Sequence, residues 1–194
     1  MDNPGSFYAL VFRMRHIVRW GLMRNSYNEN VQEHSHMVAV LAHALAVIGH
    51  EIYGKSVDPA LCAEAALFHD ASEIFTGDLP TPVKYQNPDI MTSYKQVEAL
   101  AADRLLSLLP DELKSAYTPL LREEDEEVRD VVKAADKLSA YIKCLEELKA
   151  GNTEFSSAEK QIRETLEASP LPEVGYFMEH FIPAFRLTLD ELTL

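Results

Sequence analysis

The sequence predicts an all-α protein, a compact bundle of about seven to nine helices. Apolar residues recur at three- and four-residue spacing through most of the chain, which is the period of an amphipathic helix. No segment shows the alternation of apolar and polar residues that marks a half-buried strand. The 194 residues, of which 47% are hydrophobic, suffice for one sizeable core. We therefore expect residues 1–194 to form a single domain.

The first half of the chain holds three predicted helices. Residues 6–18 and 31–53 carry apolar side chains at helical spacing, and a polar, turn-rich segment separates them. Asp58 followed by Pro59 is typical of a helix start, with Asp58 as the N-cap and Pro59 as the first helical residue. We expect this third helix to run to about residue 73.

The second half begins with a loop and continues as helices. Residues 76–89 contain one glycine and three prolines, so they cannot form a regular helix. A short amphipathic segment follows Pro110, and Gly151 ends the longest predicted helix. The helical segments expected in this half are 90–109, 111–117, 124–149, 153–168 and 172–188.

Charge and apolar runs exclude several classes of partner. The formal net charge is −13, and the absence of a basic stripe argues against binding to a nucleic-acid polymer. The N-terminal segment begins acidic and arginines interrupt its apolar stretch, unlike a signal peptide. The longest apolar run, residues 37–49, is too short to span a bilayer. We therefore expect a cytoplasmic protein without membrane contact, in which Cys62 and Cys144 are reduced and partly buried.

Four metal-capable residues form the most informative pattern of the chain. His69 and Asp70 are adjacent and end an apolar run, His34 lies 35 positions before His69, and Asp136 lies 66 positions after Asp70. Imidazole nitrogens and carboxylate oxygens suit a hydrolytic divalent metal. Adjacent residues on a helix diverge by about 100°. His69 and Asp70 can therefore reach one ion only near a helix end or a distorted turn.

These residues also have purely structural interpretations, which the sequence leaves open. A buried Asp70 beside a core His69 could be a capping or salt-bridged carboxylate, because a buried charge needs a partner. Asp136 has small and apolar neighbours, and Lys133 or Lys137 could neutralise it. Only the conjunction of the four residues favours a metal site.

Longer stretches of the chain strengthen the metal interpretation. The segments RWGLMRN, NVQEHSHMVAVLAHALA, LFHDASEIFTGDLPTPVKY and KAADKLSAYIKCLEELKAGN resemble the small bacterial 5′-deoxyribonucleotidases of the HD-domain phosphohydrolase superfamily. The resemblance spans nearly the whole chain. It implies an HD-type helical domain that hydrolyses deoxyribonucleoside 5′-monophosphates to deoxyribonucleoside and phosphate. It also implies a homodimer and a divalent metal held by His34, His69, Asp70 and Asp136.

The same resemblance implies roles for the surrounding residues. Glu73 and Asp78 are the expected catalytic residues, and which of them acts on water and which on the leaving oxygen stays open. Arg19 is expected to bind phosphate, and the indole of Trp20 to clash with a ribose 2′-hydroxyl. The expected substrate-binding residues are Arg19, Trp20, His34, Asp78, Thr81, Lys84 and Asp136.

Four protein ligands with open positions favour one octahedral ion, such as Co or Mn, over tetrahedral zinc. Two rival functions remain. Another HD phosphohydrolase, acting on cyclic or polyphosphorylated nucleotides, would use the same ligands with a different pocket, and extra phosphates would call for more than the 18 lysines and arginines present. A non-enzymatic helical binding protein would instead use the metal as a closed structural staple.

Overall fold

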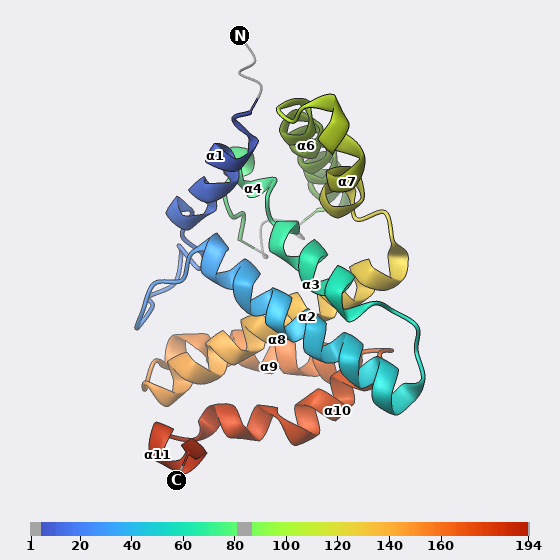
Figure 1. Ribbon diagram of the computed structural model, residues 1–194. Coiled ribbons are helices and arrows are strands. Elements are labelled where there is room, and N and C mark those ends of the chain that lie inside the picture. Colours follow the sequence, from blue (N-terminus) through green and yellow to red (C-terminus); the bar gives the residue numbers. More distant parts are fainter. Residues whose placement is uncertain (1–4, 81–86, 194) are drawn as a thin grey trace.

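The computed structural model describes residues 5–80 and 87–193 and is all-α, as predicted (Figure 1). Within these ranges, the one pairing of extended segments is an isolated antiparallel bridge between Val18 and Asn30. The helical elements are α1 (Phe7–Val11), η1 (Phe12–His16), α2 (Val31–Tyr53), α3 (Pro59–Phe68), α4 (Glu73–Thr76), α6 (Pro88–Ser107), α7 (Asp111–Arg122), α8 (Glu126–Lys149), η2 (Thr153–Phe155), α9 (Ser156–Glu167), α10 (Pro172–His180), η3 (Ile182–Arg186) and α11 (Leu189–Thr193).

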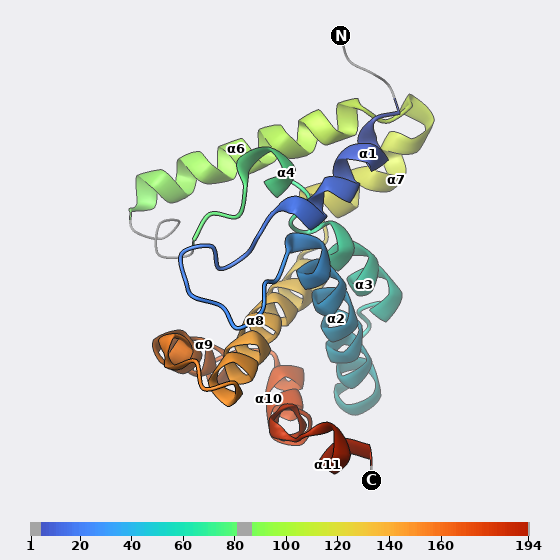
Figure 2. The same ribbon diagram turned by 90° about the vertical axis from the view of Figure 1, so that its left-hand side faces the viewer.

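The main core lies around α2 and α8. The helix α2 packs against α3, α8 and α10, and α8 packs in turn against α3 and α9. Alanines on α2 allow these helices to approach closely, with Ala42 and Ala46 buried beside Leu45 and Leu138. In Figure 2, α9, α10 and α11 cover one end of this pair and α6 crosses the opposite end.

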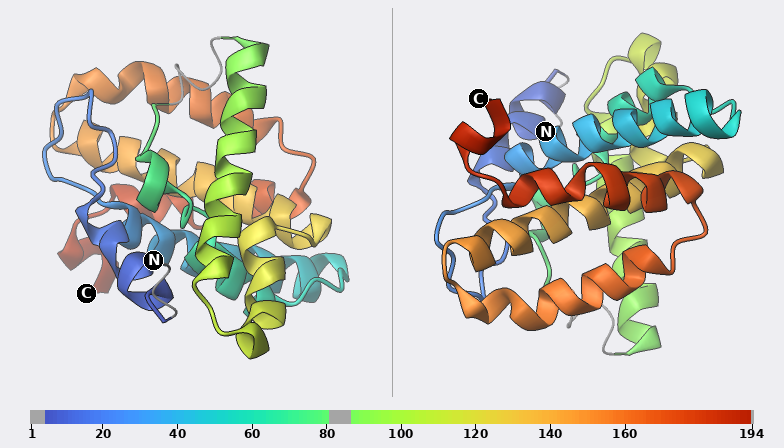
Figure 3. Two further views of the ribbon diagram at one scale, coloured as in Figure 1. Left: turned by 90° about the horizontal axis from the view of Figure 1, so that it is seen from above. Right: turned by 90° about the horizontal axis from the view of Figure 1, so that it is seen from below.

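A second, smaller core joins the N-terminal helices to α6 and α7. Phe7 is fully buried, and its ring meets Tyr117 of α7 at 5.0 Å and Phe68 of α3 at 6.5 Å between ring centroids. Leu105 and Leu109 belong to the same cluster. The two views of Figure 3 show α6 lying over the helices beneath it on one side and α10 and α11 on the other.

Helix starts follow the expected capping chemistry. The side chain of Asp58 accepts a hydrogen bond from the backbone N–H of Ala60 at 2.8 Å, which confirms the predicted N-cap. Asn30 and Glu33 form a reciprocal capping box at the start of α2. The bounds of α2 are those predicted from the periodicity.

Several predicted helices are divided or extended in the structure. The helix expected over 6–18 changes to a 3₁₀ turn after Val11, and the one expected over 172–188 is interrupted after His180. The segment after Pro110 runs through Pro119 to Arg122, beyond the predicted end. Most important for the site, α3 ends at Phe68 instead of near residue 73, and a turn separates it from α4.

By length and composition, α2 is apolar enough to cross a membrane. The shorter run of residues 37–49, on which the sequence prediction rested, lies within this helix. Half of its most apolar window is buried inside the protein. Burial against α3 and α8 is what the apolar residues of a core helix require. The composition of α2 is therefore explained by its place in the core.

Candidate active site

Three of the predicted ligand residues converge from separate parts of the fold. His34 lies near the start of α2, His69 directly follows α3, and Asp136 lies in α8. One nitrogen or oxygen atom from each lies within 4.8 Å of the others, and His34 Nε2 is 3.1 Å from Asp136 Oδ1. Such a group of two imidazoles and a carboxylate can hold one divalent metal ion.

Asp70 joins the same group. Its Oδ2 lies 3.2 Å from His69 Nε2 and 3.6 Å from His34 Nε2. The adjacent pair can face one point because α3 ends at Phe68, so His69 and Asp70 lie in the turn that follows. The structure thus meets the geometric condition that the sequence imposed on this pair.

The orientation of the two imidazoles fits a metal. His69 Nδ1 is 2.7 Å from the carbonyl oxygen of Ala66, so Nδ1 carries the proton and donates it. His34 Nδ1 faces Ser139 Oγ at 3.2 Å. In the described part of the chain the Nε2 atoms of both histidines are buried and make no hydrogen bond. Buried lone pairs without a donor, aimed at two carboxylates, are what a cation would satisfy.

Opposite charges at the cluster shift the pKa values of its side chains. Burial alone would raise the pKa of Asp70, but His69, His34 and Arg19 outweigh it and hold that pKa well below its usual value. Burial opposes the charged form of His69, yet the Asp70 carboxylate raises its pKa to about 9. The two acidic side chains at the cluster are therefore an environment that favours a positive charge.

Arg19 and Trp20 lie on the segment 17–30, which we call the Trp20 loop. Arg19 Nη1 donates to Asp70 Oδ2 at 3.3 Å, so its guanidinium borders the ligand cluster. Trp20 has a left-handed backbone, with φ of 58°, and its ring packs on Phe155 at 5.3 Å between centroids. The indole Nε1–H donates to Glu29 Oε2 at 2.9 Å.

Glu29 is a site residue that the sequence interpretation missed. It reaches Trp20 because the Trp20 loop is closed at its base by the Val18–Asn30 bridge. No helical or strand periodicity relates residues 20 and 29, so their spacing alone gave no signal.

The two predicted catalytic carboxylates lie close to the cluster along the chain. Glu73 begins α4, its side chain is only 3% exposed, and its backbone N–H donates to the Asp70 carbonyl at 3.0 Å. Asp78 is half-buried and follows Gly77, whose φ of 71° belongs to the region that favours glycine. The Asp78 carboxylate is one of the charges that raise the pKa of Arg19 against the opposing effect of burial. Thr81 and Lys84 lie outside the described residues.

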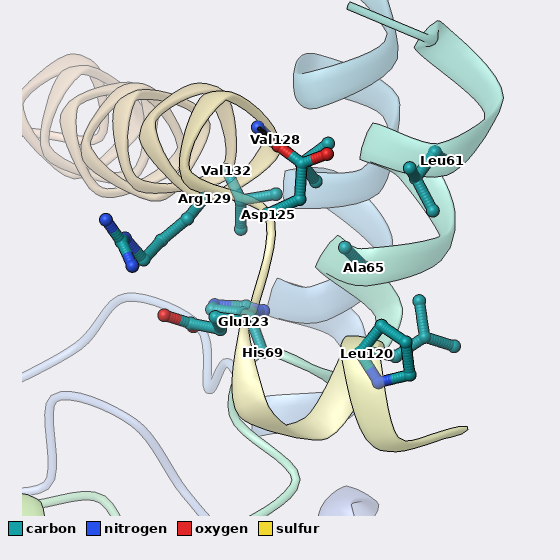
Figure 4. A pocket seen from close by; sticks show the side chains of 10 residues that line it. Leu61, Ala65, His69, Leu120, Glu123, Asp125, Val128, Arg129 and Val132 are labelled. Carbon is teal, nitrogen blue, oxygen red and sulfur yellow. Dashed lines mark hydrogen bonds between the residues drawn. The ribbon is translucent and has the colours of Figure 1, made fainter. Parts of the chain in front are cut away.

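A small cavity borders His69 on the side of the α7–α8 junction (Figure 4). Its room for water is about 40 Å³, which admits a few water molecules and no nucleoside. Glu123 lies beside His69 in Figure 4 and has a φ of 49°, and burial raises the pKa of its carboxyl. The sequence gave no indication of Glu123.

The structure also shows the partner of Asp136 and the state of the two cysteines. The carboxylate of Asp136 pairs with His34, although Lys133 and Lys137 had offered an alternative. Cys62 and Cys144 are free thiols and both are buried, as expected.

Comparison with known proteins gives a consistent result. The family model described as "5′-deoxynucleotidase YfbR-like" matches residues 6–185. A 5′-deoxynucleotidase of Shewanella oneidensis is 50% identical over 187 residues, which cover 95% of this chain and 96% of that protein. The 5′-deoxynucleotidase YfbR of Escherichia coli is 49% identical over 189 residues, covering 96% of this chain and 95% of that protein.

Solved structures share the fold. An HD-domain phosphohydrolase of Listeria innocua aligns with a TM-score of 0.79 at 24% identity, covering 93% of this chain and 88% of that one. The cyanophage S-2L HD phosphohydrolase DatZ, bound to dA and one catalytic Zn²⁺ ion, aligns with a TM-score of 0.61 at 25% identity, covering 93% of this chain and 96% of that one.

Proposed function

This chain belongs to the YfbR-like 5′-deoxynucleotidase family, and we propose that residues 1–194 act as one phosphohydrolase domain on deoxyribonucleoside 5′-monophosphates. The products are a deoxyribonucleoside and phosphate, and the reaction depends on a divalent metal. The convergence of His34, His69, Asp70 and Asp136 is the observation that carries this proposal.

His34, His69, Asp70 and Asp136 would hold the ion. When bound, such an ion polarises the phosphoryl group and makes water more acidic. Four protein ligands leave positions open on an octahedral ion, which favours Co or Mn. The zinc of the cyanophage phosphohydrolase makes zinc the necessary comparison.

Arg19 would bind the phosphate. Its guanidinium is already directed at Asp70, so a phosphoryl group beside the metal would meet both the cation and the guanidinium. His34 and Asp136 border the same space from the helices. Thr81 and Lys84 are the further phosphate contacts that we propose on sequence grounds alone.

Glu73 and Asp78 would handle the protons of the reaction. Glu73 is buried and begins the helix directly after the ligand turn, where a carboxylate can orient water and accept its proton. Asp78 lies near enough to Arg19 to contribute, after Asp70, Asp136 and Glu29, to the raised pKa of its guanidinium, and this place beside the proposed phosphate site suits contact with the leaving 5′-oxygen. The reverse assignment remains the alternative.

Trp20 would select deoxyribose. Its ring is fixed between Phe155 and Glu29, so it cannot withdraw from a 2′-hydroxyl without losing both contacts. A steric clash together with a buried, unpaired hydroxyl would cost a ribonucleotide a few kcal/mol. We further propose a cytoplasmic homodimer that acts on small nucleotides.

The experiment is phosphate release from deoxyribo- and ribonucleoside 5′-monophosphates by metal-stripped protein resupplied with Co, Mn, Mg or Zn. We expect metal-dependent release from the deoxyribonucleotides only, and none from an Asp70→Ala variant. Equal turnover of ribonucleotides would keep the reaction and reject the role of Trp20. Release only from cyclic or polyphosphorylated nucleotides would favour a different HD phosphohydrolase activity.

A further inference from the structure

Glu29 contacts both the ligand cluster and the Trp20 side chain. Its Oε2 accepts the indole hydrogen bond of Trp20 at 2.9 Å, and its Oε1 lies 3.6 Å from His34 Nδ1. Arg19 Nε lies 3.8 Å from the same Oε2. The side chain is 12% exposed, so these contacts are little screened by solvent.

The position of Glu29 is fixed by backbone contacts at the base of the Trp20 loop. The N–H of Arg19 donates to the carbonyl of Glu29 at 2.9 Å, and the N–H of Val31 donates to the carbonyl of Ile17 at 3.0 Å. The next residue, Asn30, caps α2. The carboxylate is therefore held on a short, braced segment between the loop and the helix that carries His34.

Glu29 is placed to support His34 and not to replace it as a ligand. It faces Nδ1, whereas the Nε2 atom of the same ring faces Asp70 and Asp136. Ser139 Oγ, at 3.2 Å, is the nearer neighbour of Nδ1, and the Glu29 carboxylate adds a negative charge at 3.6 Å. A carboxylate on that side of the ring favours a proton on Nδ1 and leaves Nε2 free to bind a cation.

We propose that Glu29 is a positioning residue that couples metal binding at His34 to the placement of Trp20. One of its oxygens faces the imidazole at 3.6 Å and the other accepts the hydrogen bond of the indole. Loss of the negative charge would then weaken the metal site, and loss of the whole side chain would also release the indole. The consequence for sugar selection rests on the function proposed above for Trp20, whereas the coupling itself does not.

The test compares Glu29→Gln and Glu29→Ala with Glu51→Gln, an exposed control on α2. Zinc affinity is measured by competition with a chelator, and the emission spectrum reports on Trp20, the single tryptophan of the chain. Both readouts are independent of turnover. They therefore test the coupling separately from the activity and from its preference for deoxyribose.

For Glu29→Gln we expect zinc binding about 10- to 100-fold weaker, because the charge at His34 is lost. Its emission should stay near that of the wild type, because the amide oxygen still accepts from the indole. Glu29→Ala should show the same loss of zinc affinity, a shifted emission, and a loss of roughly tenfold in discrimination against ribonucleotides.

Wild-type zinc affinity in both Glu29 variants would overturn the proposal, because His34 would then need no support from Glu29. Unchanged emission in a folded Glu29→Ala would overturn it as well, because Trp20 would then be held without Glu29. Should Glu29→Ala fail to fold, the zinc affinity of Glu29→Gln decides. Equal turnover of ribonucleotides by the wild type would reject only the role proposed for Trp20.

Discussion

The ligand cluster and the Trp20 loop adjoin each other, but different forces hold them. The cluster residues lie on α2, on α8 and in the turn after α3. The apolar faces of these three helices form the main core. The Trp20 loop has few buried apolar side chains and is held mainly by hydrogen bonds. Packing therefore positions the proposed metal ligands, whereas polar contacts position the proposed sugar-selecting side chain.

The tip of the Trp20 loop is held by a buried ion pair on α8. Glu147 and Lys143 are 0% and 2% exposed. Glu147 accepts from the backbone N–H of Ser26 at 2.9 Å, and Lys143 Nζ donates to the carbonyl of Tyr27 at 2.9 Å. Asp136 lies on the same helix. The helix α8 thus supports both regions, through apolar packing in one and through charge in the other.

The largest expected effect comes from removing a ligand. Asp136→Ala should lower phosphate release by about a thousandfold or more, because several kcal/mol of transition-state stabilisation depend on the metal. Measured zinc content should fall with it. Asp130→Ala, which removes an exposed carboxylate of α8, should retain both. Full activity in Asp136→Ala would exclude Asp136 from the site.

A substitution at Glu73 distinguishes loss of catalysis from loss of metal. Glu73→Gln should lower kcat by about 10²- to 10⁴-fold while zinc content stays at the wild-type level, because Glu73 handles a proton and holds no metal. Steady-state kinetics and metal analysis on the same sample check both statements. Normal turnover in a zinc-loaded Glu73→Gln would remove Glu73 from the mechanism and leave Asp78 as the proton carrier.

A substitution at Glu147 tests how much the buried ion pair beneath the Trp20 loop contributes to stability. Glu147→Gln leaves Lys143 buried without a charged partner, which should cost about 3 kcal/mol or more in the free energy of unfolding. Glu146→Gln changes the neighbouring, exposed carboxylate that contacts Tyr27 and should cost under about 1 kcal/mol. Denaturant titrations measure both. Equal losses would show that the buried pair contributes no more than the exposed contact.

Trp20 tests the specificity of the loop. Trp20→Ala should raise ribonucleotide turnover relative to deoxyribonucleotide turnover by roughly tenfold or more, without loss of zinc. The ratio of kcat/KM for a matched nucleotide pair is the measurement. An unchanged ratio would mean that another part of the site reads the sugar.

The smallest expected effect is a difference in pH dependence. Burial opposes the charge on Glu147, but hydrogen bonds from Lys143, Asn152 and Ser26 lower its pKa from 4.5 to about 2. Between these values the unfolded chain binds more protons, so the stability that Glu147 contributes is present above pH 4.5 and is lost as the pH falls toward 2. Wild-type stability should fall more steeply than that of Glu147→Gln in this window, as measured by urea unfolding at each pH. Parallel curves would contradict the assignment.

The two regions also differ in what the sequence could predict. The bounds of α2 and the Asp58 cap followed from periodicity and local capping chemistry. The four candidate ligands stood out as a pattern, and the family resemblance implied their role. The early end of α3 did not, because AEAALF continues smoothly into His69 and only the tertiary structure stops the helix.

The contacts that hold the Trp20 loop could not be predicted from the sequence, because they join residues that are far apart in the chain. Glu147 meets Ser26 across 121 residues of chain, and no periodic pattern relates two positions in separate elements. Glu29 was missed because the bridge between Val18 and Asn30 that fixes it follows from no periodic pattern. Glu123 was missed because its left-handed backbone at the end of α7 has no marker in the sequence. Sequence motifs were enough to identify the proposed ligand residues. The contacts that hold the Trp20 loop beside them could be identified only from the three-dimensional structure.

The proposed metal site is tested most directly by the number of metal ions that restore activity to metal-stripped protein. Titration with Co, Mn or Zn, followed by release of phosphate from a deoxyribonucleoside 5′-monophosphate, gives this number. We predict activity that rises to a plateau at one ion per chain and does not rise in Asp70→Ala. Full activity in the stripped protein, or no recovery with any of these ions, would contradict the proposed metal site.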